Sequence, residues 1–356
     1  MNTSYDEELC RFPRHIIDNK QVLVVFSVLI TVVATLTFLS NGTVLLAMLH
    51  TLRKQSDLPR INNHHHNSHI TKLLILSMTF AGVFVGAFVM PLGLVELIHN
   101  GTWTLGTSMY KIRVLVDYLL CNITSLHTTF MAVDTYLVVC RPLVYRLLTP
   151  RVGYIMIAVA WILPTLIILL WWLLHPNSLN PCIYFSDFCS KSDNLRLLNI
   201  ICGSLFFILF ITVWLLYLFV LRQVWRFRKR AACIGNSKVK RPAVDGIFSI
   251  DIQESNCGEL GTLDKDSIVK KQTFAALKSF RFIGTVLLFF TIFWLPDFIK
   301  ILFLFNCANA LPLWVSNIFD YATYLSCTVN PMIYCFNKSI KLAVKNLICT
   351  THFKRR

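Results

Sequence analysis

The sequence has 356 residues, of which 55% are hydrophobic and 15% charged, with 34 Lys and Arg against 18 Asp and Glu. Soluble domains carry about 25% charged residues, and a nucleic-acid-binding protein with a net charge of +16 would carry more charge in total, so we expect no nucleic-acid partner. The aromatic content of 13% excludes a disordered chain. The composition therefore indicates a membrane protein embedded in a lipid bilayer.

Seven apolar stretches are long enough to cross a bilayer, whose hydrocarbon core requires about 20 residues of helix. The third stretch is the most polar, and we expect it to lie centrally among the others. The predicted fold class is an all-α membrane protein with a seven-transmembrane helix bundle over residues 22–336. The seven spans are Val22–Leu49, Ile70–Leu97, Tyr110–Cys140, Val152–Leu174, Leu197–Leu221, Phe282–Phe305 and Leu313–Phe336.

The distribution of basic residues predicts the orientation of the chain. Most Lys and Arg fall after spans one, three and five and in the tail, and basic residues are retained on the cytoplasmic side. Residues 1–21 are therefore predicted to be extracellular. Glycosylation sequons at Asn2 and Asn100 lie in segments predicted to be outside.

Two cytoplasmic segments complete the predicted organisation. Residues 223–278 form a third cytoplasmic loop, which we expect to be flexible because basic ends flank an acidic middle that carries Ser and Gly. Residues 337–356 form the tail, which is predicted to begin with a short amphipathic helix after span seven.

Short motifs on four separate spans point to one receptor family. Span seven ends in Asn-Pro-x-x-Tyr, span six carries Phe-Trp-Leu-Pro, span four has a lone Trp and span one an Asn followed by Val. The chain resembles the rhodopsin-like (class A) G-protein-coupled receptors in all four. The residues concerned are Asn330, Pro331, Tyr334, Phe293, Trp294, Leu295, Pro296, Trp161, Asn41 and Val44.

Span three narrows this resemblance. It contains Asp117 and Cys121 as Asp-x-x-x-Cys, an inner His127, and Asp134 and Tyr136 at the spacing of an Asp-Arg-Tyr motif. In this respect the chain is similar to the aminergic receptors, and most of all to the trace-amine-associated receptors.

The resemblance implies a plasma-membrane receptor for a small amine, of chemosensory or trace-amine type. Its expected intracellular partners are a heterotrimeric G protein and arrestin, and it implies no cofactor, metal site or enzyme activity. The ligand cavity implied by the resemblance is lined by Asp117, Tyr118, Cys121, Trp294, Phe298 and Tyr324. The residues implied in activation are Asp134, Thr135, Tyr136, Asn330, Pro331 and Tyr334.

The spacing of two acids supports the same ligand independently. Asp117 and Asp134 lie about 26 Å apart along one helix, so one carboxylate is expected near each end of span three. A buried carboxylate is costly unless it is paired, and no Lys or Arg is evidently placed within the bundle to pair with Asp117. A ligand ammonium would satisfy it; the alternative is a structural carboxylate bonded to Tyr324.

Two further acids suggest a ligand with more than one charge. Asp297 follows Pro296, and Asp320 lies one helical turn before Tyr324. Three ionised carboxylates around one cavity would repel each other, and a di- or polyamine would offset this with one ammonium on Asp117 and another on Asp297 or Asp320. In the alternative, Asp297 or Asp320 faces water at the mouth.

Span five argues against a catechol ligand. Ile201 and Leu205 stand at the positions where catecholamine receptors carry serines, and only Ser204 is nearby.

Several residues depart from the family pattern. Gly82 replaces the acid of span two, Thr135 the Arg that follows Asp134, Leu209 the proline of span five, and Tyr110 the half-cystine of span three. Two interpretations stay open: a receptor that couples through altered contacts, or an amine-binding decoy without conventional G-protein signalling.

The loss of the half-cystine in span three leaves the disulfide pattern undetermined. Cys10, Cys182, Cys189 and Cys307 are all predicted to be outside, where oxidation is favoured, and four thiols allow three pairings. The resemblance implies Cys10 bonded to one of the loop cysteines, and Cys182–Cys189 is the rival pairing.

Overall fold

The computed structural model describes residues 19–56, 69–99, 101–176, 179, 193–239, 284–300, 313–335 and 338–353. All regular elements of this described part are helices. The predicted glycosylation sites Asn2 and Asn100 and the disulfide candidates Cys10, Cys182 and Cys189 lie outside the described residues. The helices are α2 (Lys20–Ser56), α3 (His69–Phe84), the π-helix η2 (Val85–Val89), α4 (Met90–Ile98), α5 (Gly106–Cys140), α6 (Pro142–Leu147), α7 (Pro150–Leu174), α9 (Asp193–Val239), the helix over 284–300, α11 (Leu313–Tyr334) and α12 (Lys338–Phe353).

The predicted all-α fold class is confirmed, and each predicted span corresponds to a helix. Within the described part of the chain, five helical stretches are long and apolar enough to cross a membrane: α2, the continuous α3–η2–α4 stretch, α5, α7 and α9. The helix over 284–300 and α11 occupy the positions of predicted spans six and seven.

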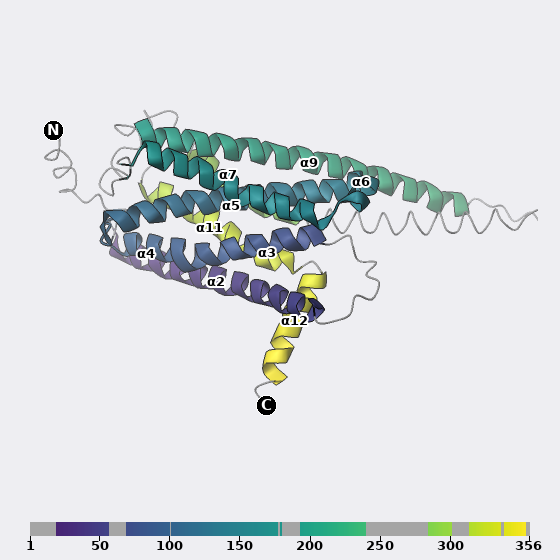
Figure 1. Ribbon diagram of the computed structural model, residues 1–356, viewed down its shortest axis with the longest axis horizontal. Helices are drawn as coiled ribbons and strands as arrows, with labels where there is room; N and C mark the ends of the chain where they lie inside the picture. Colours follow the sequence, from purple (N-terminus) through teal and green to yellow (C-terminus); the bar gives the residue numbers. More distant parts are fainter. Residues whose placement is uncertain are drawn as a thin grey trace, which may run out of the picture.

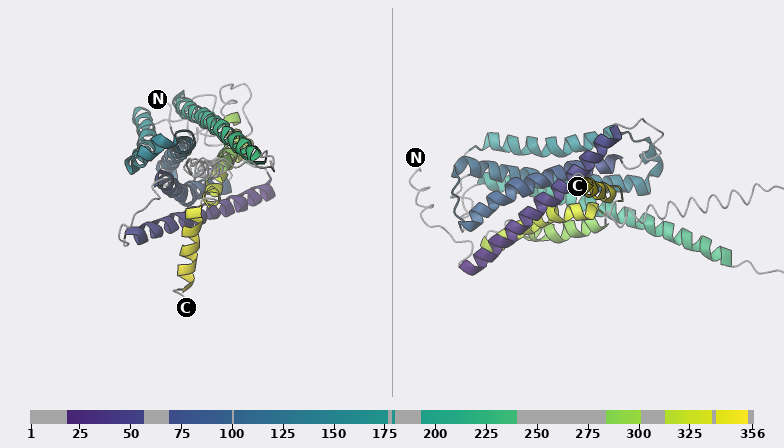
Figure 2. Two further views of the ribbon diagram at one scale, coloured as in Figure 1. Left: turned by 90° about the vertical axis from the view of Figure 1, so that its right-hand side faces the viewer. Right: turned by 90° about the horizontal axis from the view of Figure 1, so that it is seen from below.

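Helix α5 lies at the centre of the bundle, as its polarity predicts (Figure 1). In its most apolar stretch 67% of the residues are buried, against 17% for both α2 and α9. It packs against α9, α7 and α3, while α2 crosses obliquely over α3, α4 and α11 (Figure 2). Side chains on α5 are therefore enclosed by other helices, which allows polar residues to be buried there.

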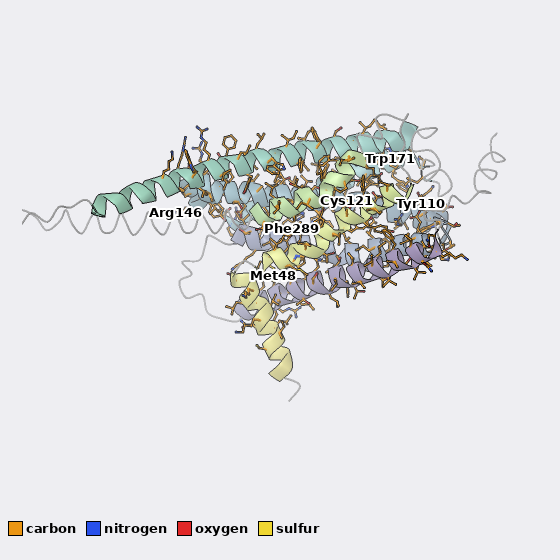
Figure 3. The ribbon with its side chains drawn as sticks, turned by 180° about the vertical axis from the view of Figure 1, so that it is seen from behind. Met48, Tyr110, Cys121, Arg146, Trp171 and Phe289 are labelled. Carbon is orange, nitrogen blue, oxygen red and sulfur yellow. The ribbon has the colours of Figure 1, made fainter. Side chains whose placement is uncertain are left out.

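The two ends of the bundle serve as reference points. We call them the Asp117 end and the Asp134 end, after the two acids of α5. Tyr110 and Trp171 lie toward the first end, Arg146 lies toward the second, and Cys121 lies between them (Figure 3).

At the Asp134 end the structure corrects the predicted boundary of the third loop. Helix α9 continues to Val239, so residues 223–239 of the segment predicted to be flexible are helical, and the rest of that segment lies outside the described residues. The helix continues because Val220 and Val224 are buried against Val139 of α5. Helix α12 then leaves the bundle at a steep angle (Figure 1), in the position predicted for the short amphipathic helix.

Candidate functional site

Asp117 of α5 is half-buried and receives two neutral donors. The hydroxyl of Tyr324 on α11 donates to its Oδ2 at 2.7 Å, and the thiol of Cys121, one turn further along α5, lies 3.7 Å from Oδ1. Because neither donor carries a charge, the hydrogen bonds orient the carboxylate without neutralising it. The geometry thus contains the Tyr324 contact expected of a structural acid and also leaves a negative charge for a cationic ligand.

An aromatic cluster lies beside this carboxylate. Trp294 stacks on Phe206 of α9 with ring centroids 4.3 Å apart, and Phe298 lies 4.8 Å from the same ring. Cys121 packs against this cluster, so the residue that contacts Asp117 also contacts the aromatic wall. Of the predicted residues, Cys121 and Tyr324 thus contact Asp117 directly, and Trp294 and Phe298 pack in the cluster that Cys121 joins.

Tyr118 and the inner face of α9 differ from the sequence-based expectation. Tyr118 packs with Tyr110 and Trp171 on another side of α5. At this level of α9, Cys202 and Phe206 are buried, whereas Ile201 is 38% exposed and Leu205 is half-buried. The inner face of α9 is therefore one position away from the face that was compared with the serines of catecholamine receptors.

An ion pair between α4 and α5 was missed from the sequence. Nη1 of Arg113 lies 2.9 Å from Oε2 of Glu96, and the side chains are only 12% and 5% exposed. Arg113 is one helical turn from Asp117, so the expectation that the bundle holds no cation near this acid is wrong. Both residues lie near helix ends, where the sequence pattern resembles that of an exposed loop.

A second ion pair joins the helix over 284–300 to α11. Lys300 is buried and its ammonium bonds to Asp320. Asp297 lies one turn before Lys300 and is half-buried. Since Asp320 already has a cation of the protein, the two acids proposed for a second ammonium are no longer equivalent.

An aromatic cluster occupies the place of the expected half-cystine. Tyr110 is fully buried, its ring centroid lies 5.6 Å from that of Trp103, and it packs with Trp171 and Leu198. Apolar packing therefore joins α5, α7 and α9 at the Asp117 end.

At the Asp134 end, hydroxyl groups hold the second acid of α5. The hydroxyl of Thr71 on α3 donates to Oδ2 of Asp134 at 2.5 Å, and Tyr145 of α6 contributes a further hydrogen bond. Burial and the neighbouring carboxylate raise the pKa of Tyr145, which keeps its hydroxyl protonated and able to donate. Thr135 bonds within its own helix, to the carbonyl of Met131 at 2.9 Å.

The other residues predicted to act in activation are packed inside the bundle or against α9. The ring of Tyr136 lies 6.2 Å from that of Phe219 on α9. On α11, Pro331 is buried and Asn330 half-buried, and the hydroxyl of Tyr334 lies 2.8 Å from the sulfur of Met78.

The position of the missing acid on α3 is filled by a neighbouring helix. A Cβ atom on Gly82 would lie 2.4 Å from Oδ1 of Asn41. Asn41 is held there by two hydrogen bonds from its Nδ2, to the carbonyls of Thr37 at 2.8 Å and Cys327 at 3.0 Å. The glycine thus permits a close approach of α2 and α3. Among the described residues, no three His, Cys, Asp or Glu side chains are grouped so as to hold a metal ion.

Comparison with known proteins agrees with the sequence motifs. The family model described as "7 transmembrane receptor (rhodopsin family)" matches residues 40–334. The mouse (Mus musculus) trace amine-associated receptor 8b is 27% identical over 286 residues, covering 78% of each chain. The mouse 5-hydroxytryptamine receptor 5B is 27% identical over 338 residues, covering 92% of this chain and 85% of the relative. The D(1A) dopamine receptor of Xenopus laevis is 26% identical over 314 residues, covering 81% and 67%.

Proposed function

Because this chain belongs to the rhodopsin family of seven-transmembrane receptors, we propose that it is a receptor for a small amine, with Asp117 as the counter-ion of the ligand ammonium. Members of this family are multi-pass proteins of the plasma membrane that act through G proteins and are not enzymes. The names of its relatives include trace amines, 5-hydroxytryptamine and dopamine, which are all amines.

The surroundings of Asp117 carry this proposal. A half-buried carboxylate with only neutral donors gains most from a cation that brings its own charge. The neighbouring rings of Trp294 and Phe298 add cation–π attraction, which is worth about 0.5–2 kcal/mol per contact.

We further propose a di- or polyamine as the preferred ligand, with its second ammonium on Asp297. Lys300 bonds directly to Asp320 and so competes with a ligand there, whereas Asp297 lacks an ion pair of this kind among the described residues. Asp297 is attracted by Lys300 and repelled by both Asp320 and Asp117, and a dication between Asp117 and Asp297 would relieve the repulsion between these two acids.

For signalling we propose coupling to a G protein through contacts that do not use the missing arginine. Thr135 is too short to reach out of the bundle and bonds to its own helix. The extension of α9 instead presents the exposed basic side chains of Arg222, Arg226 and Lys229 at the Asp134 end, and these suit an acidic protein surface.

The test is an amine panel on cells that express the receptor, with binding, cyclic AMP and arrestin recruitment measured together. Monoamines, diamines and polyamines are compared, and Asp117→Asn is expected to lose binding while still reaching the surface. Amine binding that is unchanged in Asp117→Asn contradicts the proposal. Binding without any second-messenger or arrestin response would instead favour a decoy, and uptake of labelled amine would favour a transporter.

A further inference from the structure

The feature that carries a further inference is the position of Arg113 relative to Asp117. They are four residues apart on α5, and side chains at this spacing lie on the same helix face, close enough to form an ion pair. The positive charge of Arg113 is near enough to attract the Asp117 carboxylate. Arg113 could therefore form an ion pair with the Asp117 carboxylate, which a ligand ammonium needs.

Contacts from α4 and from the segment before α5 hold the guanidinium of Arg113 against α4 instead. Glu96 binds its Nη1 at 2.9 Å, and the ring of Trp103 lies 6.0 Å from its central carbon. Gly93 leaves room for it, because a Cβ atom there would lie 3.3 Å from Nη2 of Arg113. The hydroxyl of Tyr321 on α11 donates to the carbonyl of Gly93 at 3.3 Å, which ties α11 to this part of α4.

Glu96 brings a negative charge to Arg113, and it is almost fully buried. A buried cation that loses a carboxylate partner is strongly disfavoured, so we expect Arg113 without Glu96 to turn toward another acid that already attracts it. On α5 that acid is Asp117, one turn away. The ammonium of a ligand would then have to displace a cation of the protein before it could bind.

We propose that Glu96 is a positioning residue that holds Arg113 against α4 and thereby keeps Asp117 available to the ligand ammonium. The inference rests on the proposed amine site, and Glu96 itself does not touch the ligand in this arrangement. The inference makes a prediction that a merely structural ion pair does not make. Ligand affinity that is lost when Glu96 is replaced should return when Arg113 is replaced as well.

The experiment measures displacement of a labelled monoamine that binds the wild-type receptor, using Glu96→Gln, Arg113→Gln and the double variant. In Glu96→Gln the Kd is expected to rise about tenfold or more, because Arg113 then occupies Asp117 in most receptors and only the remaining fraction can bind the ligand. In the double variant the Kd is expected to return to within about threefold of wild type, since no cation is left to compete. Arg113→Gln alone is expected to bind as tightly as wild type or more tightly.

The matched control removes the carboxylate of the second ion pair, whose Asp320 side chain is 40% exposed. Asp320→Asn takes the partner from Lys300 but leaves Glu96 and Arg113 in place, so any effect of this change on the Kd should not be cured by Arg113→Gln.

The inference is overturned if Glu96→Gln binds as wild type, or if its weaker binding persists in the double variant. Where Glu96→Gln fails to reach the cell surface, Arg113→Gln still decides the matter, because a large loss of affinity in that single variant contradicts a competing role for Arg113. Binding that is unchanged in Asp117→Asn overturns the proposed amine site, and this inference with it. Binding that is lost in Asp117→Asn but unaffected by Glu96→Gln overturns this inference alone.

Discussion

Helix α5 carries an acid toward each end, and the protein surrounds the two in different ways. Asp134 is 2% exposed and is held by hydroxyls of Thr71 and Tyr145 from two neighbouring elements. Asp117 is half-buried and accepts one hydroxyl and one thiol, with two ion pairs and a further acid around it. Hydroxyls from α3 and α6 thus enclose Asp134 within the fold and connect those elements to α5, whereas Asp117 stays partly exposed and can meet a ligand. The Asp134 end is therefore built as a joint between helices, and the Asp117 end holds the proposed binding site.

The most direct way to break this comparison is to neutralise each acid in turn. Asp117→Asn is expected to weaken amine binding by about a hundredfold or more, because a charge-paired contact is worth about 2–5 kcal/mol when one partner is removed. Asp134→Asn should leave the Kd within about threefold of wild type. Radioligand displacement on matched amounts of surface receptor measures both, and equal losses in the two variants would contradict the division into two ends.

The joint at the Asp134 end can be tested through stability. Thr71→Val removes the hydroxyl that bonds to Asp134 and keeps the shape of the side chain, so the free energy of unfolding should fall by about 2 kcal/mol. Thermal unfolding in detergent measures the change. Thr43→Val is the matched control, because Thr43 is half-buried on α2 and its hydroxyl bonds to the carbonyl of Leu39 within the same helix. A similar decrease in both variants would mean that the Asp134 contact adds nothing.

Between the two ends, the contact of Gly82 with Asn41 can be tested by adding one methyl group. Gly82→Ala should lower the free energy of unfolding by about 1–2 kcal/mol, because the new Cβ collides with a hydrogen-bonded side chain. Gly42→Ala is the control. Nothing lies within 4 Å of a Cβ atom at that position, and alanine in a helix is expected to stabilise by about 0.5–1 kcal/mol. The free energy of unfolding measured by chemical denaturation should therefore fall in Gly82→Ala and rise in Gly42→Ala.

The smallest expected effect concerns the choice between mono- and diamines. Lys300→Gln removes a cation from the neighbourhood of Asp297 and Asp320, so the potency of diamines should rise about threefold to tenfold. This range corresponds to roughly 1 kcal/mol of relieved repulsion. Monoamine potency should change by less than about twofold. Dose–response curves for monoamines and for diamines of increasing length measure both potencies. An equal gain for the two ligand classes would argue against a second ammonium site.

Much of the Asp117 site could be predicted from the sequence, because its members follow motif spacing. Asp117, Cys121, Trp294 and Tyr324 each stand at a fixed distance from a recognisable motif, and the structure brings them together. The depth of Trp294 and Tyr324 in the membrane could be predicted from their positions along their spans, since all the spans cross the same bilayer.

The charged surroundings of Asp117 could not be predicted in the same way. Glu96, Arg113 and Lys300 lie near the ends of their spans, where charged residues are common and usually exposed. Whether such a side chain faces water, lipid or the interior depends on the rotation and tilt of its helix, and small rotations are set by packing against several neighbours. The same reason explains the inner face of α9, where Cys202 and Phe206 are buried in place of Ile201 and Leu205.

Hydropathy and motif spacing were sufficient for the number of spans, the central position of α5 and the acids at both of its ends. These properties depend on local chemistry, since apolar length and the cost of buried charge are read residue by residue. Only the tertiary structure decided which acids already have a cation of the protein, and so which acid we propose for the ligand. The ion pairs between α4 and α5, and between the helix over 284–300 and α11, join residues on different helices, and their partners are set by the packing of those helices.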